Sequence, residues 1–90
     1  MKVKYLKEYA WVLRGLQRKA VIQVMDKPKI PSQIHREAKK INLKLSLNNT
    51  SDALRSFVGK GIAKCLNPSE KVGRVYELTL KGKVIREQLL

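Results

Sequence analysis

The chain has 90 residues, 43% of them hydrophobic, which is enough for one packed domain over residues 1–90 and too few for two. It contains one cysteine and one histidine, so the sequence predicts no internal disulfide, no metal site and no bound cofactor. Lysine and arginine number 20 against 7 acidic residues, a net charge of +13, which favours a nucleic acid as the partner over a merely solvated charged surface.

A helical pattern occupies residues 5–25, where apolar residues recur at helical spacing with basic residues between them. These apolar residues are Leu6, Tyr9, Leu13, Leu16, Ala20 and Val24. The pattern is compatible with one long helix or with two. Gly15 is the point of division, because glycine costs a helix about 1 kcal/mol relative to alanine. The second helix would then cover residues 16–25.

Two prolines within residues 26–31 end this helical region, and Ile30 could add one residue to a short edge strand. A further helix is predicted over residues 31–41, with proline in its first turn. Its buried face is expected to hold Ile34, Ala38 and Ile41. Its outward face is expected to hold Arg36, Lys39 and Lys40.

The segment INLKLSL, residues 41–47, leads to a helix predicted over residues 48–59. Asn48 is its predicted N-cap, and Lys60-Gly61 is its predicted stop, since glycine readily takes the left-handed conformation that ends a helix. The predicted buried stripe consists of Leu47, Thr50, Leu54, Phe57 and Val58.

Two strands are predicted next, at residues 62–66 and 74–80, joined by the turn-rich loop NPSEKVG. In the second strand, either Val75 and Leu78 or, in the alternate phase, Tyr76 and Leu78 face the core. Cys65 is interpreted as a buried small apolar residue, with a redox-sensing thiol as the alternative. A last helix over residues 81–90 would bury Val84, Ile85 and Leu89.

Three helices followed by a hairpin and a closing helix predict a mainly α fold with a small β-hairpin wing (α+β), a winged helix-turn-helix. In such a fold the third helix enters the major groove of DNA, and the wing lies along the backbone. The recognition helix is therefore expected at about residues 48–59 and the wing at about residues 63–78.

The segments WVLRGLQRKAVI, KIPSQI, SDALRSFVGKGIAKCLNP and GRVYELTLKGK resemble a family of small winged-helix transcription regulators common in archaea. That family is more distantly related to the MarR and ArsR types. Two features depart from its pattern: Ile30 stands where a small capping residue is usual, and residues 41–47 are longer than the usual turn and lack glycine. The resemblance implies a transcription regulator that binds double-stranded DNA. The sequence shows no carboxylate pair, nucleophile with base or phosphate loop, so an enzyme is not expected.

Polar residues beside the apolar stripe of the predicted recognition helix are the candidates for reading bases. They are Asn48, Asn49, Asp52 and Arg55. Asparagine can form two hydrogen bonds to adenine, and arginine can form two to guanine. The alternative for the asparagines is that Asn48 only caps the helix and Asn49 is solvated. For Asp52, an ion pair with Arg55 is favoured over acceptance from a cytosine amino group.

A second set of residues is expected to bind phosphate without reading sequence. This set is Ser51, Arg36, Lys39, Lys40, Lys44, Lys71 and Arg74. The pair in the wing, Lys71 and Arg74, is the strongest candidate. Lys39 and Lys40 could equally form a solvated face.

Regulators of this size commonly pair, so that two recognition helices meet successive major grooves. We expect a homodimer through the first and last helices, with Tyr5, Tyr9 and Trp11 in its interface or in the core. No apolar run reaches about 20 residues and no signal peptide is recognisable, so a cytoplasmic protein is expected. Two alternatives stay open: a non-specific architectural DNA-binding protein and a winged-helix protein-interaction module.

Overall fold

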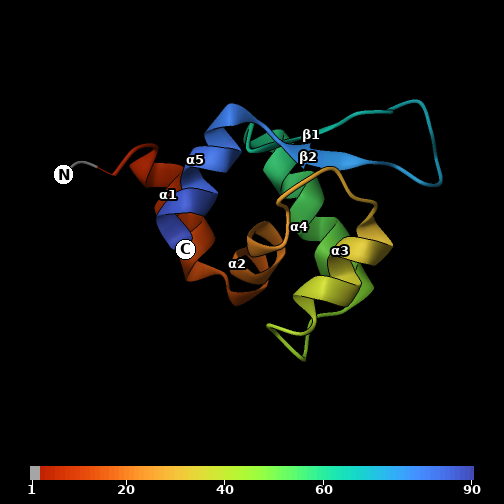
Figure 1. The fold of residues 1–90 in the computed structure, drawn as a ribbon, viewed down its shortest axis with the longest axis horizontal. Coiled ribbons are helices and arrows are strands. Elements are labelled where there is room, and N and C mark those ends of the chain that lie inside the picture. Colours follow the sequence, from red (N-terminus) through yellow and green to blue (C-terminus); the bar gives the residue numbers. More distant parts are fainter. Residues whose placement is uncertain (1–2) are drawn as a thin grey trace.

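The computed structural model describes residues 3–90. Its elements are α1 (Leu6–Arg14), α2 (Leu16–Gln23), α3 (Pro31–Ala38), α4 (Leu47–Gly59), β1 (Ala63–Cys65), β2 (Tyr76–Leu78) and α5 (Leu80–Leu89). Figure 1 shows α1 and α5 side by side at one end, and the loop that joins β1 to β2 projecting at the other. This arrangement confirms the predicted winged helix-turn-helix, mainly α with a hairpin wing.

One hydrophobic core joins the helices of this fold. Val21 on α2, Ile34 on α3, Phe57 on α4 and Ile85 on α5 are each completely buried. Burying a side chain of this size stabilises the folded chain by about 1.5–3 kcal/mol. The helix α4 packs against α2, α3 and β1, which fixes its position.

The division of the first helical region at Gly15 is confirmed, because Gly15 has extended backbone angles that end α1 and begin α2. This break changes the phase of the apolar pattern. Leu6, Leu13 and Leu16 belong to the predicted helical pattern, yet all three are exposed. The buried residues are Val12, Ala20, Val21 and Ile22.

The third helix, α3, ends at Ala38, earlier than the predicted end at Ile41. The exposed Ile41 lies in the connection to α4, so its predicted place in the core is wrong. Ile30 precedes α3 without any side-chain cap. The residue that pairs with the hairpin is Lys29 and not Ile30: Lys29 N donates to Tyr76 O at 3.0 Å, and Tyr76 N donates to Lys29 O at 2.9 Å.

The start of α4 differs from the prediction, because Ser46 and not Asn48 is its N-cap. Asn49 N donates to Ser46 Oγ at 3.0 Å, and Ser46 N donates to Asn49 Oδ1 at 3.3 Å, which together form a capping box. Leu47 and Val58 are exposed, so their predicted burial is wrong. The buried stripe of α4 consists of Thr50, Ala53, Leu54 and Phe57.

The two strands pair antiparallel, with Cys65 opposite Tyr76, and both are shorter than predicted. Tyr76 and Leu78 are the buried residues of β2, which confirms the alternate phase. Gly61 has a φ of 74° after the end of α4, so the predicted left-handed stop is confirmed. Cys65 is only half-buried, with Sγ 3.6 Å from Asn67 Oδ1, so its predicted burial is partial.

The last helix begins at Leu80 and is capped by Thr79, whose Oγ1 accepts from Gly82 N at 3.2 Å. Its Ile85 is buried as predicted, whereas Val84 and Leu89 are only half-buried. Across residues 3–90, none of the helices combines the length and the apolar character needed to cross a membrane.

Candidate nucleic-acid interface

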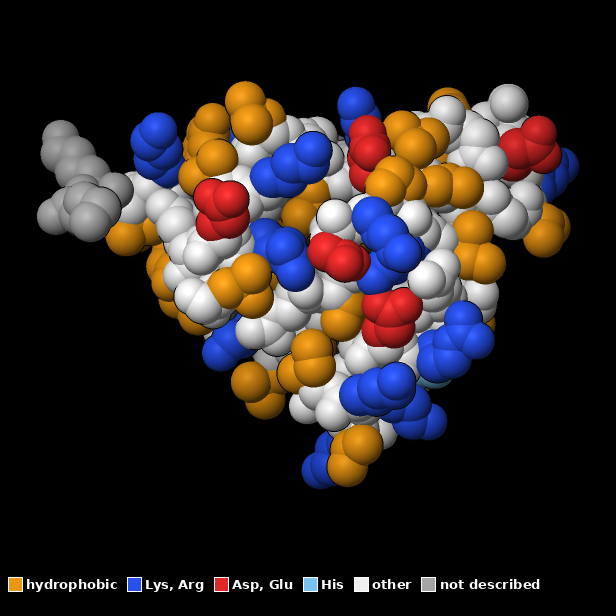
Figure 2. All heavy atoms as spheres, in the orientation of Figure 1, with side chains coloured by type: hydrophobic (Ala, Val, Ile, Leu, Met, Phe, Trp, Pro, Cys, Tyr) orange, Lys and Arg blue, Asp and Glu red, His pale blue; other side chains and the backbone are white. Residues whose placement is uncertain are grey.

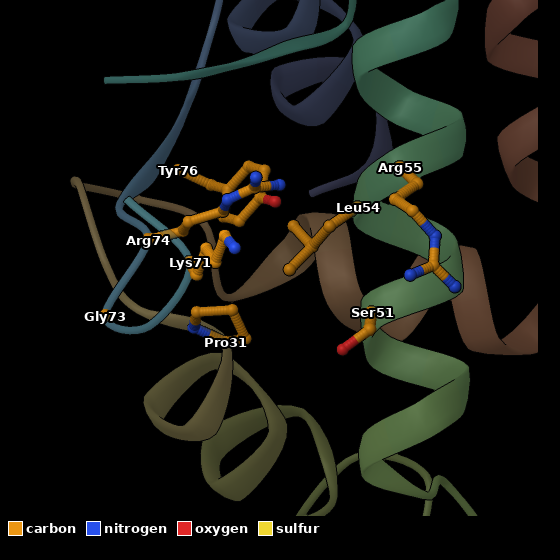
Figure 3. Close-up of a pocket in the computed structure, with 8 residues that line it drawn as sticks. All are labelled: Pro31, Ser51, Leu54, Arg55, Lys71, Gly73, Arg74 and Tyr76. Atoms are coloured by element: carbon orange, nitrogen blue, oxygen red, sulfur yellow. The ribbon is translucent and has the colours of Figure 1, made fainter. Parts of the chain in front are cut away.

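A cleft of about 240 Å³ lies between α4, the start of α3 and the loop of the hairpin (Figure 3). Its lining residues are Pro31, Ser51, Leu54, Arg55, Lys71, Gly73, Arg74 and Tyr76. Four of them, Ser51, Arg55, Lys71 and Arg74, are residues that the sequence predicts to contact DNA. Arg55, Lys71 and Arg74 are the cationic lining residues, and no acidic residue lines the cleft. The Arg55 side chain is turned away from the hairpin loop and pairs with Asp52, so the positive charge that suits a phosphate group comes from Lys71 and Arg74.

The walls of the cleft come from segments about twenty residues apart in the chain. Figure 3 shows Ser51 and Leu54 pointing from α4 toward the hairpin loop, while Lys71 and Arg74 reach from that loop toward α4. Leu54 and Tyr76 are buried and form an apolar base beneath these polar groups. The cleft is therefore polar at its walls and rigid at its base.

The outward face of α4 carries the predicted base-reading residues. Asn48, Asp52 and Arg55 follow one another at spacings of four and three residues, which places them on one face of the helix, and all three are exposed. Arg55 forms an ion pair with Asp52, so the favoured interpretation of Asp52 is confirmed. An exposed pair of this kind is worth at most about 1 kcal/mol, so Arg55 can exchange it for another hydrogen-bond partner at little cost.

The two asparagines at the start of α4 have different surroundings. Asn49 Oδ1 accepts hydrogen bonds from Ser46 N and, at 2.8 Å, from Ser46 Oγ. A bidentate contact from Asn49 to adenine would therefore compete with the capping box. Asn48 is exposed beside it and takes no part in that capping box, which makes Asn48 the better placed of the two for base contact.

The predicted phosphate-binding residues outside the cleft are Arg36, Lys39, Lys40 and Lys44, and all are exposed. Arg36 lies on α3, and the three lysines lie in the connection from α3 to α4. Figure 2 shows lysine and arginine side chains gathered over α3 and this connection. Cationic side chains therefore lie before the start of α4 and, with Lys71 and Arg74, beside its middle on the side of the hairpin.

Asn67 organises the hairpin loop and was not predicted from the sequence. Its Oδ1 accepts from Val75 N at 2.7 Å, and its Nδ2 donates to Gly73 O at 3.1 Å. These bonds close the base of the loop. Asparagine in the segment NPSEKVG predicts a turn in general terms, but the partners of its side chain depend on the strand register.

The Arg74 side chain is held by backbone carbonyls of the same loop. Its Nε donates to Glu70 O at 2.6 Å, and its Nη2 donates to Pro68 O at 3.4 Å. These contacts hold the loop in the form that presents Lys71 to the cleft. Arg74 thus has two functions available to it, shaping the loop and offering positive charge.

Lys29 contacts several elements beneath this interface, although nothing in the sequence predicts that it is buried. Only 5% of Lys29 is exposed, and its Nζ donates to Asp26 Oδ1 at 2.6 Å, Glu37 Oε1 at 2.5 Å and Val24 O at 2.7 Å. Its backbone pairs with Tyr76 of β2. One residue therefore links the end of α2, the helix α3 and the wing.

The charges around Lys29 shift one another's pKa values. Burial alone would lower the pKa of Lys29, but its hydrogen bonds to Asp26 and Glu37 outweigh burial and raise that pKa. The hydrogen bond from Lys29 is also the main cause that holds the pKa of both carboxyl groups below their ordinary values. The three groups are charged together across the neutral pH range.

Lys29→Met is expected to lower the free energy of unfolding by about 1–3 kcal/mol at neutral pH, because methionine fills the space without making the charged hydrogen bonds. The lowered pKa of Glu37 adds stability above its ordinary value of 4.5, and this stability is lost as pH falls through the lowered value. The raised pKa of Lys29 adds stability below 10.5, which is lost as pH rises through the raised value.

Urea denaturation of both proteins across a pH series measures this effect. The difference in stability should be constant between about pH 5 and pH 10 and should shrink on either side. A difference that persists unchanged at pH 2 would mean that packing, and not charge, accounts for the contribution of Lys29.

No family model matches the chain, and no curated protein matches it. Solved structures of MarR from E. coli match the chain. Wild-type MarR in its apo form has a TM-score of 0.57 and 27% sequence identity, covering 97% of this chain and 64% of the MarR chain. A cysteine-to-serine mutant of MarR complexed with operator DNA has a TM-score of 0.57 and 26% identity, covering 97% and 61% of the two chains.

The chain has a MarR-like winged-helix fold. The same mutant of MarR without DNA also matches, with a TM-score of 0.57 and 27% identity over 97% of this chain. The chain spans less than two thirds of the MarR chains that it matches.

Proposed function

We propose that the chain is a sequence-specific DNA-binding transcription regulator. In this proposal α4 is the recognition helix in the major groove, and the hairpin loop is a wing on the DNA backbone. The observation that carries it is the acid-free cleft between α4 and the loop, with Arg55, Lys71 and Arg74 in its lining. The MarR-like fold supports it, since one of the similar MarR structures is complexed with operator DNA.

The dimensions and side chains of α4 suit the major groove. Its 13 residues make a rod about 20 Å long, and a helix of ordinary diameter fits a groove about 12 Å wide. With Asn48 and Arg55 turned to the base edges, Lys71 and Arg74 would hold the backbone strand that passes through the cleft. Arg36, Lys39, Lys40 and Lys44 would then contact phosphates beyond the start of α4.

Arg55→Ala is expected to reduce affinity for the preferred sequence about 5- to 150-fold, corresponding to about 1–3 kcal/mol, and to relax the preference at one base pair. The preferred sequence is obtained by selecting bound fragments from random DNA, and affinity is then measured by fluorescence anisotropy. Arg14→Ala is the matched control, since it removes an exposed arginine from α1, away from the cleft. If Arg55→Ala keeps the wild-type preference, α4 does not read the bases.

We further propose that the chain acts as a homodimer. The helices α1 and α5 pack against each other and leave leucine side chains exposed: Leu6, Leu13, Leu80 and Leu90. A pair joined through these helices would bring two copies of α4 to successive major grooves, about 34 Å apart. Sedimentation velocity at micromolar concentration measures this state.

We also propose that residues 1–90 act as one domain in the cytoplasm, without enzymatic activity. The four segments that resemble archaeal winged-helix regulators support a closer relationship to that group within the MarR-like fold.

A further inference from the structure

A second hollow lies between α2 and the connection from α3 to α4, with a volume of about 660 Å³. Its lining residues are Leu16, Lys19, Ala20, Gln23, Ile41, Asn42, Leu43 and Lys44. We call it the α2 groove. It shares no lining residue with the cleft between α4 and the hairpin loop.

The α2 groove is lined by large apolar side chains that are not part of the hydrophobic core. Leu16 is 75% exposed, Ile41 55% and Leu43 78%. Single exposed apolar side chains are common on protein surfaces, but three large ones around one hollow gather apolar surface in the way that interaction sites do.

The wall of the groove formed by the connection is held in place by its own hydrogen bonds. Asn42 N donates to Ala38 O at 3.0 Å, Leu45 N donates to Asn42 O at 3.0 Å, and Leu45 O lies 2.9 Å from His35 Nε2. Leu45 is almost completely buried and anchors the segment, which leaves Ile41 and Leu43 turned outward. The groove is thus formed before any partner arrives.

The charge around the α2 groove determines which partner fits. Lys19 and Lys44 are its charged lining residues, and no carboxylate lines it. The exposed Lys39 and Lys40 directly precede the lining residues 41–44 in the sequence. A second copy of the chain, with 7 acidic residues against 20 basic ones, offers few carboxylates to Lys19 and Lys44, and the leucines proposed for the homodimer lie on α1 and α5 instead. DNA offers little apolar surface to Leu16, Ile41 and Leu43.

We propose that the α2 groove binds an acidic amphipathic helix of a partner protein. The apolar face of such a helix, with side chains at positions i, i+3, i+4 and i+7, packs against Leu16, Ile41 and Leu43. Glutamate or aspartate along its edges pairs with Lys19 and Lys44. Through this groove, the chain holds an acidic partner beside its proposed DNA-binding surface. Lys44, which is also a candidate for phosphate contact, is the lining lysine for which DNA and the partner helix compete.

The probe for this proposal is a synthetic 18-residue peptide with leucine at helical spacing and glutamate at most other positions. A scrambled peptide of the same composition and a peptide with lysine in place of glutamate are the controls. Each is titrated into the full chain with labelled methyl groups, alone and bound to a 20-base-pair duplex. The expected result is chemical-shift change centred on Leu16, Ile41 and Leu43, with affinity about tenfold above that of the scrambled peptide.

Leu16→Ser is expected to lower the affinity for the acidic peptide about tenfold, because it removes an exposed leucine from the groove. It should leave the affinity for DNA unchanged, because Leu16 does not line the cleft between α4 and the hairpin loop. Leu66→Ser is its matched control, since Leu66 is 47% exposed after the end of β1 and does not line the groove, and it should leave peptide binding unchanged. Three results would each overturn the proposal. The scrambled peptide could bind as tightly as the acidic peptide, the chemical-shift changes could centre on the cleft between α4 and the hairpin loop, or Leu16→Ser could bind the acidic peptide as tightly as the wild type does. Self-association that Leu16→Ser abolishes would also overturn it, because the occupant would then be a second copy.

Discussion

Lys71→Ala combined with Arg74→Ala is expected to weaken binding to every DNA sequence alike, by about 10- to 100-fold at physiological ionic strength. Both side chains line the cleft from the hairpin loop, where the proposed function places the DNA backbone and not the bases. Loss of two phosphate contacts should also reduce the slope of log affinity against log salt by about 2. Arg74 additionally holds the loop through the carbonyl oxygens of Pro68 and Glu70, so the double change affects the shape of the wing as well.

Anisotropy titrations on selected and random duplexes between 50 and 300 mM salt, roughly the range in which phosphate contacts dominate, measure this effect. The matched control is Lys7→Ala combined with Lys83→Ala, which removes the same charge from exposed positions on α1 and α5. If both double variants lose the same affinity, the loss reflects net charge alone and the wing has no particular part in binding.

Gly82→Ala is expected to destabilise the fold by about 2–3 kcal/mol, because a methyl group at this position has no room. The Cβ would lie 2.1 Å from Ile62 O and 3.1 Å from Leu78 Cβ. Ile62 O is a backbone atom that also accepts a hydrogen bond from Thr79 N at 3.0 Å, so it cannot move away without breaking that bond. To admit the methyl group, α5 must move away from the start of β1.

Gly59→Ala is the control for this substitution. Gly59 also lies in a helix, at the end of α4, but its Cβ would meet nothing within 4 Å. Alanine is favoured over glycine in a helix by up to about 1 kcal/mol, so this variant should be neutral or slightly more stable. Urea denaturation monitored by circular dichroism compares the two. Equal stability of Gly82→Ala and the wild type would show that α5 does not pack on Ile62 as described.

The features that the sequence predicts correctly are those decided locally. Gly15 divides the first helical region and Gly61 ends α4, because both depend on backbone preferences of one residue. The alternate phase of β2, with Tyr76 and Leu78 inward, was one of two possibilities that a period of two residues leaves open. Pairing with β1 and contact with the core select between them.

The features that the sequence misses depend on tertiary contacts. Ser46, the N-cap of α4, lies between two leucines in the sequence, so the pattern favoured the following polar residue, Asn48, as the cap. Ile41 continues the spacing of α3 but lies beyond its end, because the chain turns after Ala38 toward the buried Leu45. Lys29 looks like any surface lysine, and only the fold brings Asp26 and Glu37 to it.

For the candidate site, charge and helix faces indicate which residues are available but not which of them meet. Ser51, Arg55, Lys71 and Arg74 were predicted separately, and the fold brings them to one cleft. Asn49 was predicted to read bases, yet its side chain belongs to the capping box, since the position of the cap decides what the asparagine is free to contact.

The measurement that tests the proposed function most directly is a salt titration of binding to a selected duplex and to a random duplex. The proposal predicts steep salt dependence on both, with affinity for the selected duplex at least about 1,000-fold higher at physiological salt. Steep dependence without preference would indicate a non-specific architectural protein. Absence of binding to either duplex would contradict the assignment of α4 and the hairpin loop to DNA and would favour a protein-interaction module.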